Sequence, residues 1–402
     1  MEQWKEYRLE DFIHFNPTIT LKKGTVARKI AMDNLIPHSR KIYSWSIEPY
    51  SGGAKFQNGD TIMARITPCL ENGKHSYVSI LDEGEIAYGS TEYIVMRGIN
   101  GISNNLFVYY LSQYSKFKNA AVKSMVGSSG RQRAQVDVLK NLAFNLPGLT
   151  EQKRIADFLS SLDDKIELNR QINDNLEQQA QALFKSWFVD FEPFKDSEFV
   201  DSELGMIPKG WEIVPLGDMV SVIDNRGKTP PLSECSTKFP IIDVKALSGS
   251  HRIINYSNCS KYVTEDIYNS FFRSGHPDKY DILLSTVGSL AELKIYMINK
   301  GTIAQNVVAL RSKYPLYLYQ YLFNKKGDLI SYNIGSVQPS IKVTHIVKYA
   351  ILLPPKETII NFENILNSLT NQILKNENEC QSLESIRDTL LPRLMSGELK
   401  IN

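Results

Sequence analysis

The sequence predicts an α+β protein in which two globular α/β domains alternate with two long antiparallel helices. Two observations lead to this fold class. The stretch from Glu151 to Glu192 contains no proline or glycine, and its apolar residues recur at alternating spacings of four and three, as in a coiled coil. Its apolar pattern then recurs 207 positions later in the chain. The chain therefore reads as an internal tandem duplication with pseudo-two-fold symmetry.

The first helix is expected to be about 58 Å long, at ~1.5 Å per residue. A rod of this length with one narrow apolar seam needs a partner, and the second helix supplies a seam in the same register. The positions expected to pack between the helices are Ile155, Leu159, Leu162, Ile166, Asn169, Leu176 and Leu183 in the first, and Phe362, Leu366, Leu369, Ile373, Asn376, Leu383 and Leu390 in the second.

Each seam carries an asparagine near the middle of its helix, at equivalent positions of the repeat. Because the helices are expected to run antiparallel, we expect Asn169 and Asn376 to meet near the symmetry axis. A buried asparagine can set the register of a coiled coil. A polar contact between these two amides is therefore predicted.

The repeat also fixes the expected domain boundaries. Trp4 and Leu9 recur as Trp211 and Leu216. Two units of about 150 residues match ordinary domain sizes. The expected segments are residues 1–150 for the first domain, 151–192 for the first helix, 193–210 for a linker, 211–355 for the second domain, and 356–402 for the second helix.

Within the first domain, short β-type runs alternate with turns rich in glycine, asparagine and proline. A strand is expected at Thr61–Ile66 and a short amphipathic helix at Leu106–Lys118. The second domain follows the same plan, with a strand at Asp281–Ser285 and an aromatic helix at Leu316–Leu322. Pro392 is expected to kink or end the second long helix.

Composition narrows the class of protein. No apolar run approaches the ~20 residues of a membrane span, so no membrane partner is expected. The four cysteines are scattered and the first residues are polar, which is typical of a reduced, cytoplasmic protein. The two helices carry net charges of −4 and −2 in a chain of net charge +2, which leaves +8 on the remainder. This segregation favours a polyanionic partner for the domains.

No catalytic constellation is recognisable in the sequence. The six histidines lack metal-ligand spacing, so no metal site is expected. Gly227-Lys228-Thr229 imitates the end of a phosphate-binding loop, but Val222 stands where that loop needs a glycine. We therefore expect a non-catalytic chain.

Three segments resemble the specificity subunits of type I restriction–modification systems. They are WFVDFEPF at 187–194, SELGMIPKGWE at 202–212 and LLPRLMSGEL at 390–399. The resemblance spans the whole chain and includes its duplication. It implies two target recognition domains, each reading one half of a bipartite, asymmetric site in double-stranded DNA, with the helix pair as a spacer of fixed length.

The resemblance also implies partners. Two methyltransferase subunits would dock on the scaffold, and restriction subunits with motor and nuclease activity would join them. S-adenosylmethionine would be bound by the methyltransferase subunit, so this chain itself needs no cofactor.

Two other function classes remain open at the level of sequence. The chain could be the recognition portion of a split DNA methyltransferase–nuclease, although no N-P-P-Y/F motif occurs in it. It could also be a tandem-domain adaptor that binds protein. An interaction that is independent of salt, with no affinity for DNA, would favour the adaptor.

The expected DNA contacts lie in two loops at the same place in the repeats, 127–133 and 335–342. Arginine can bind phosphate or guanine edges, and glutamine can pair with adenine; solvated surface loops are the alternative. The candidate residues are Ser128, Arg131, Gln132 and Arg133 in the first loop, Ser336, Gln338, Ser340 and Lys342 in the second, and Arg65, Lys74, Arg226, Lys228 and Lys245 elsewhere.

Overall fold

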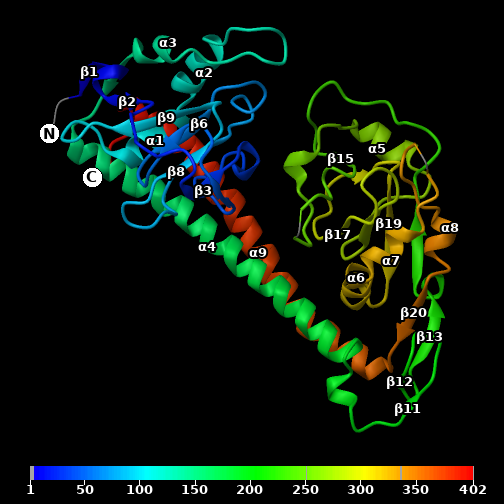
Figure 1. Ribbon diagram of the computed structural model, residues 1–402. Helices are drawn as coiled ribbons and strands as arrows, with labels where there is room; N and C mark the ends of the chain where they lie inside the picture. The colour runs from blue at the N-terminus through cyan, green and yellow to red at the C-terminus, as the bar shows by residue number, and fades with distance from the viewer. Residues whose placement is uncertain (1–3, 250, 336, 402) are drawn as a thin grey trace. The chain divides into compact units, whose positions relative to one another are not determined.

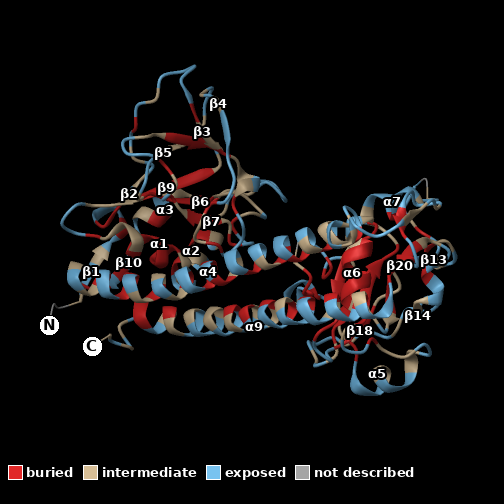
Figure 2. Ribbon diagram, turned by 90° about the horizontal axis from the view of Figure 1, so that it is seen from below, coloured by how far each residue is buried: buried red, intermediate tan, exposed pale blue. Residues whose placement is uncertain are grey.

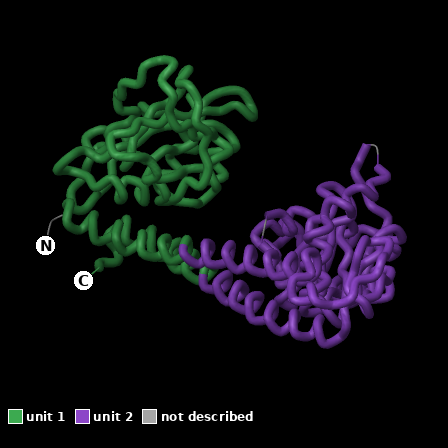
Figure 3. The backbone as a smooth tube through the Cα atoms, turned by 60° about the horizontal axis from the view of Figure 1, so that its bottom comes forward, with its two compact units in different colours: residues 1–167, 380–402 green, residues 168–379 purple. Residues whose placement is uncertain are grey.

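The computed structural model describes residues 4–249, 251–335 and 337–401 (Figure 1). Contacts divide the chain into two compact units, residues 1–167 with 380–402 and residues 168–379 (Figure 3). Each unit contains one globular domain and a part of both long helices. The division differs from the five expected segments because the helices complete the hydrophobic cores of the domains instead of forming a separate body.

The first unit is built around an antiparallel four-stranded sheet in the order β2-β9-β6-β7. A second four-stranded sheet has the order β4-β3-β8-β5, in which only the β3–β8 pair is parallel. The short strands β1 and β10 pair separately and bring the start of the domain to its end. The strands are β1 Lys5–Arg8, β2 Ile13–Phe15, β3 Val26–Ile30, β4 Ser46–Pro49, β5 Lys55–Phe56, β6 Thr61–Ala64, β7 His75–Tyr77, β8 Ala87–Gly89, β9 Tyr93–Gly98 and β10 Ala143–Leu146.

The central strands β6 and β9 are buried on both faces. Successive side chains of a strand point to opposite faces. Ile62 and Val95 therefore enter one core, beneath the second sheet, while Met63 and Ile94 enter the other, beside α1. This double burial explains why the strands read as continuous apolar runs (Figure 2).

Three helices follow β9 in the first unit. The expected helix at Leu106–Lys118 is in fact two helices, α1 Asn105–Gln113 and α2 Ser115–Lys123. The Asn104 side chain caps α1 by accepting a hydrogen bond from the Phe107 N–H. The third helix is α3 Val136–Lys140.

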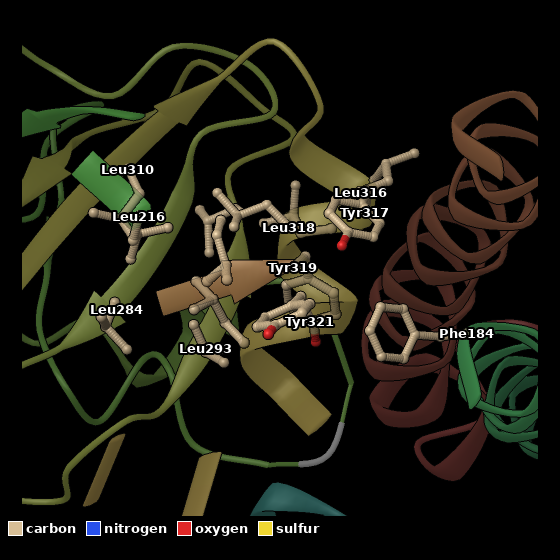
Figure 4. Close-up of a cluster of buried hydrophobic side chains, with 14 of the residues drawn as sticks. Phe184, Leu216, Leu284, Leu293, Leu310, Leu316, Tyr317, Leu318, Tyr319 and Tyr321 are labelled. Carbon is tan, nitrogen blue, oxygen red and sulfur yellow. The ribbon is translucent and has the colours of Figure 1, made fainter. Parts of the chain in front are cut away.

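The second unit repeats this plan. Its antiparallel sheet has the order β14-β19-β16-β17, and the parallel pair β15–β18 corresponds to β3–β8. The tyrosines of the aromatic helix α6 lie in the core, where Phe184 of the first long helix meets Tyr317 and Tyr321 (Figure 4). The elements are β11 Phe199–Val200, β12 Ile207–Pro208, β13 Glu212–Pro215, β14 Val220–Ile223, β15 Ile241–Ile242, α5 Glu265–Phe271, β16 Ile282–Ser285, β17 Leu293–Ile295, β18 Thr302–Ile303, β19 Val307–Ser312, α6 Pro315–Asn324, α7 Lys326–Ser331, α8 Val343–Ile346 and β20 Ala350–Leu353.

An arginine binds a buried aspartate at the same place in both domains. Arg97 of β9 binds Asp60 through Nε and Nη2 at 2.6 and 2.7 Å. Arg311 of β19 binds Asp281 in the same way, at 3.0 and 2.8 Å. Both carboxylates are almost completely buried and each precedes the equivalent central strand, β6 or β16. The duplication therefore extends to the polar groups inside the domains.

The long helices are α4 Leu149–Phe188 and α9 Lys356–Met395, each of 40 residues. Pro392 was expected to kink or end the second helix. It does not end the helix, because α9 continues to Met395. Only one turn follows the proline, and the neighbouring Leu391 and Leu394 are held in the core of the first unit. None of the described helices is both long and apolar enough to cross a membrane.

The expected seam faces inward along both helices, which alternate between buried and exposed residues (Figure 2). Fourteen positions were expected to pack, and none of them is exposed. Buried are Ile155, Leu159, Ile166, Asn169, Phe362, Leu366, Ile373 and Asn376, and partly buried are Leu162, Leu176, Leu183, Leu369, Leu383 and Leu390.

The structure corrects the expected pairing of the two asparagines. Asn376 Nδ2 donates to Asn173 Oδ1 at 2.8 Å, while Asn169 donates to Glu379 at 2.8 Å. The antiparallel register places Asn376 opposite Asn173, one helical turn beyond the position that is equivalent in the repeat. All three asparagines are buried, and each has a polar partner.

Candidate nucleic-acid interface

The first candidate loop, residues 126–134, lies against the segment that follows β6. The Thr67 N–H donates to the Gln132 carbonyl at 3.0 Å, and the Ala134 N–H donates to the Arg65 carbonyl at 2.8 Å. Val126 and Arg133 also exchange backbone hydrogen bonds across the loop, at 3.1 and 3.0 Å. The backbone is therefore fixed on the sheet, and the tip projects from it.

The side chains of this loop divide into outward and inward groups. Ser128 and Arg131 are exposed, and Gln132 is half-buried. No carboxylate among the described residues forms an ion pair with Arg131. Its guanidinium therefore remains available for a phosphate or a guanine edge.

Arg133 was expected to contact DNA, and the structure pairs its side chain, which is 40% exposed, with a carboxylate of the same domain. Its Nε and Nη2 bind the carboxylate of Glu92 at 2.7 to 3.0 Å, and Arg65 lies 3.7 Å from the same carboxylate. The hydrogen bonds from Arg133 lower the pKa of Glu92, and the same contacts raise the pKa of Arg133. Glu92 thus holds both arginines at the strand end, which leaves Arg131 as the outward-facing cation of the loop.

The second loop has the same backbone hydrogen bonds. The Gly288 N–H donates to the Pro339 carbonyl at 3.0 Å, and the Ile341 N–H donates to the Thr286 carbonyl at 2.8 Å. Thr286 follows β16 as Arg65 follows β6, so Pro339 corresponds to Gln132. By the same alignment, Gln338 of the second domain stands where Arg131 stands in the first.

The tip of the second loop is exposed. Val337 is 98% exposed, and Gln338 and Lys342 are also on the surface. Ser340 is half-buried because its backbone N–H donates to Asn333 Oδ1 at 2.9 Å. Ser336 lies outside the described residues.

A third segment, residues 224–229, contacts the residues that come just before β19. The Gln305 side chain donates to Thr229 Oγ1 at 3.3 Å, and the Asn306 carbonyl accepts from the Thr286 N–H at 2.9 Å. Asn225, Thr229, Gln305 and Asn306 contribute to the lining of a cavity of about 270 Å³. Amide groups around an open cavity can accept from and donate to base edges.

The basic residues expected near this segment differ in their availability. Arg226 binds Asp224 of its own loop at 2.5 to 2.9 Å, so its charge is balanced. Lys228 is exposed. Lys245 is also exposed and borders a hollow of about 430 Å³ with Ser289, which follows Gly288 of the loop contact. Lys228 and Lys245 are thus outward-facing cations of the second domain.

Lys74 is not brought to the interface. Its ammonium donates to the Met32 carbonyl at 3.0 Å and lies 3.5 Å from Asp33. The side chain is only 18% exposed. The structure therefore assigns Lys74 to packing within the first domain, because its ammonium is satisfied by the segment it crosses.

Sequence reasoning missed the residues that come just before β9 and β19. Glu92 and Asn306 occupy equivalent places, since each carbonyl accepts from the residue after the neighbouring central strand. Neither residue carries a local signal of this role. The contact of Glu92 with Arg133 of the first loop joins positions 41 residues apart, so it could not be read from the sequence.

The chemistry of the two sites is that of binding. Among the described residues, no group of three or more His, Cys, Asp or Glu side chains lies together as a metal site requires. The outward-facing groups are guanidinium, ammonium, amide and hydroxyl, which bind phosphate oxygens and base edges. Exposed loops that carry such groups on equivalent supports in both domains are typical of a nucleic-acid-binding protein.

Comparison with known proteins agrees with this class. The family model of the type I restriction modification DNA specificity domain matches residues 1–178 and again 208–385. The MjaIX specificity subunit of a type I restriction enzyme from Methanocaldococcus jannaschii is 31% identical over 73% of this chain and 69% of its own. The HindI specificity subunit from Haemophilus influenzae is 27% identical over 99% of this chain and 100% of its own.

A solved structure shares the fold. The S subunit of a type I restriction-modification system from M. genitalium matches with a TM-score of 0.53 and 17% sequence identity, over 98% of this chain and 96% of that one.

The chain belongs to the type I restriction-modification DNA specificity family. The expected family and fold class, two recognition domains with a helical spacer, are confirmed. Its relatives are named as specificity subunits, which supports the expected non-catalytic role.

Proposed function

We propose that this chain gives a type I restriction–modification complex its DNA sequence specificity. Each recognition domain reads one half of a bipartite, asymmetric site in double-stranded DNA, and the helix pair sets the spacing of the halves. The complex works in the cytoplasm. Two methyltransferase subunits dock on the scaffold and bind S-adenosylmethionine, and restriction subunits join for cleavage.

One observation carries the proposal. The same backbone hydrogen bonds hold the loops 126–134 and 333–342 at equivalent strand ends, yet the side chain at the tip is Arg131 in one and Gln338 in the other. Arginine pairs with guanine or phosphate, whereas glutamine pairs with adenine. A common scaffold that presents different groups is what two readers of different half-sites require.

The first experiment maps adenine methylation across the genome in cells that carry this chain with its cognate methyltransferase. A split, asymmetric motif that disappears when the chain is removed supports the proposal. A methylation pattern that does not depend on the chain contradicts it.

Two variants then assign the reading sites. Arg131→Ala and Gln338→Ala should each weaken binding of the reconstituted complex by about 1–3 kcal/mol, each in its own half-site only. If Arg131 contacts phosphate, its loss instead lowers the salt slope of binding by about 1. Arg8→Ala removes an arginine of β1 that is 54% exposed and serves as the matched control. If binding to DNA is unchanged in both loop variants at several salt concentrations, the alternative function, an adaptor that binds protein, is favoured instead.

A further inference from the structure

Two arginines occupy the same place in the two recognition domains, beside the outer strand of each central sheet. The Tyr77 N–H of β7 donates to the Arg40 carbonyl at 2.9 Å. The Ile295 N–H of β17 donates to the Arg252 carbonyl at 2.7 Å. Since Tyr77 and Ile295 are equivalent in the sheet register, Arg40 and Arg252 are equivalent residues of the duplication.

Arg252 is fully buried and contacts both long helices. Its Nε and Nη2 donate to the Glu177 carboxylate of α4 at 2.9 and 2.7 Å, and its backbone N–H donates to the same carboxylate at 2.9 Å. Its Nη1 donates to Thr370 Oγ1 of α9 at 2.6 Å. The guanidinium also lies 5.5 Å from the ring of Tyr319. A single side chain thus ties the domain to both helices within the second unit.

The loop that carries Arg252 is held from the inside as well. The buried ammonium of Lys294 donates to the Gly249 carbonyl at 2.8 Å and also to the His251 carbonyl. Burial lowers the pKa of Lys294 to about 8. These bonds fix the backbone on either side of residue 250, so the guanidinium of Arg252 is presented in one orientation.

Arg40 makes a different contact in the first unit. Its side chain is 11% exposed and forms an ion pair with Asp164 of α4, whose own side chain is 57% exposed. Asp164 is the repeat counterpart of Asn371, one residue from Thr370, whereas the counterpart of Glu177 is Glu384. The buried fork that contacts both helices is therefore described for Arg252.

We propose that Arg252 is a positioning residue that fixes the angle of the second recognition domain on the two helices and thereby the spacing of the two half-sites. The DNA part of this inference rests on the proposed function. An apolar contact tolerates sliding, whereas a buried guanidinium–carboxylate fork is satisfied in one geometry only. A buried ion pair need not stabilise the fold more than apolar residues of similar volume would. Its contribution is then to select one orientation of the domain on the helices.

The test separates positioning from folding by replacing both charges. Arg252→Met alone leaves the Glu177 carboxylate buried without its partner, which by itself destabilises the fold. The double variant Arg252→Met with Glu177→Met retains volume without a buried charge. Lys209→Met, which removes an exposed ion pair with Glu198 in the same unit, is the control.

The first readout needs no DNA. Spin labels at Ser270 of the domain and Gln178 of α4 report the distance between domain and helix, with Cys69 and Cys235 changed to Ser because they are not buried. We expect a single narrow distance distribution in the parent and the control, and a broadened or shifted one in the double variant. An unchanged distribution in the folded double variant would overturn the proposal.

The second readout uses the complex with its cognate methyltransferase on a library of the two half-sites at different spacings. We expect methylation at spacings one base pair from the native one to rise by about tenfold in the double variant, with the half-sites unchanged. Broadened distances with the native spacing preference intact would also overturn the proposal. If the parent chain yields no split motif, the proposed function is wrong. The spin-label measurement then still tests whether Arg252 fixes the angle of the domain on the helices.

Discussion

The pair Asn173–Asn376 offers a quantitative test of what a polar group does inside the helix pair. Asn376 is 3% exposed, donates to Asn173 Oδ1 at 2.8 Å and accepts from Gln372 at 2.7 Å. Asn173 is completely buried. We predict that Asn376→Ala lowers the free energy of unfolding by about 2–3 kcal/mol, because it removes these bonds and leaves a buried amide oxygen without its donor.

The double variant should behave differently. Replacing both partners by leucine removes the Asn173 amide oxygen together with its donor, so no buried polar group of this pair is left without a partner. Such a change can leave the free energy of unfolding nearly unchanged. Asn173→Leu with Asn376→Leu should therefore cost less than the two single leucine changes summed, with a coupling energy of about 2 kcal/mol.

Urea unfolding followed by far-ultraviolet circular dichroism measures the three leucine variants and Asn376→Ala. Asn364→Ala, at an exposed position of the same helix, is the matched control and should change stability by no more than about 0.5 kcal/mol. Additive costs in the double variant, or a cost of Asn376→Ala no larger than that of the control, would refute the reasoning.

Two further predictions concern titratable groups in the domains. Burial raises the pKa of Glu363 from 4.5 to about 7, so the folded chain holds a proton that the unfolded chain releases, and stability falls as pH rises through this window. Glu363→Gln should remove that part of the pH dependence, measured as urea midpoints at about pH 5 and about pH 8; an unchanged difference between the two contradicts it. Asp60→Asn should cost about 2–3 kcal/mol of stability, because this buried carboxylate accepts from both Nε and Nη2 of Arg97. Asp281→Asn should cost less, about 1 kcal/mol, because Asp278 also lies 2.8 Å from Arg311 and keeps the partly exposed guanidinium paired. Urea unfolding in which Asp60→Asn matches an exposed control would argue against this structural role.

The long helices and the duplication could be predicted because the residue pattern of the sequence shows both directly. A stretch without proline or glycine and with alternating spacings of four and three permits little besides a helix that packs along one face. The boundaries came within a few residues, with α4 ending at Phe188 where Glu192 was expected. The exception at Pro392 has a tertiary cause, since neighbouring leucines anchor the last turn in the domain core.

The partner of each polar group could not be predicted. The sequence shows that Asn376 lies on the seam, but the residue opposite it depends on where two antiparallel helices cross. Arg133 was interpreted as a DNA contact because its loop lies at the same place in both repeats and arginine can bind phosphate or guanine edges. Its actual partner, Glu92, is 41 positions away and becomes visible only when the loop is folded onto the strand end. Arg252 was not singled out for the same reason, since nothing in its local sequence indicates complete burial.

The two recognition domains share an inward-facing aspartate but differ at the loop tips. Asp60 and Asp281 are buried at equivalent places and each binds an arginine, although Arg311 also pairs with Asp278. At the strand ends, Glu92 is replaced by Asn306, and at the loop tips Arg131 is replaced by Gln338. The duplication accounts for the same backbone hydrogen bonds beneath the loops in both units. On the proposed function, a fixed support with different side chains at its tip lets the two half-sites differ without a change of fold, and exchange of Arg131 and Gln338 between the loops tests this.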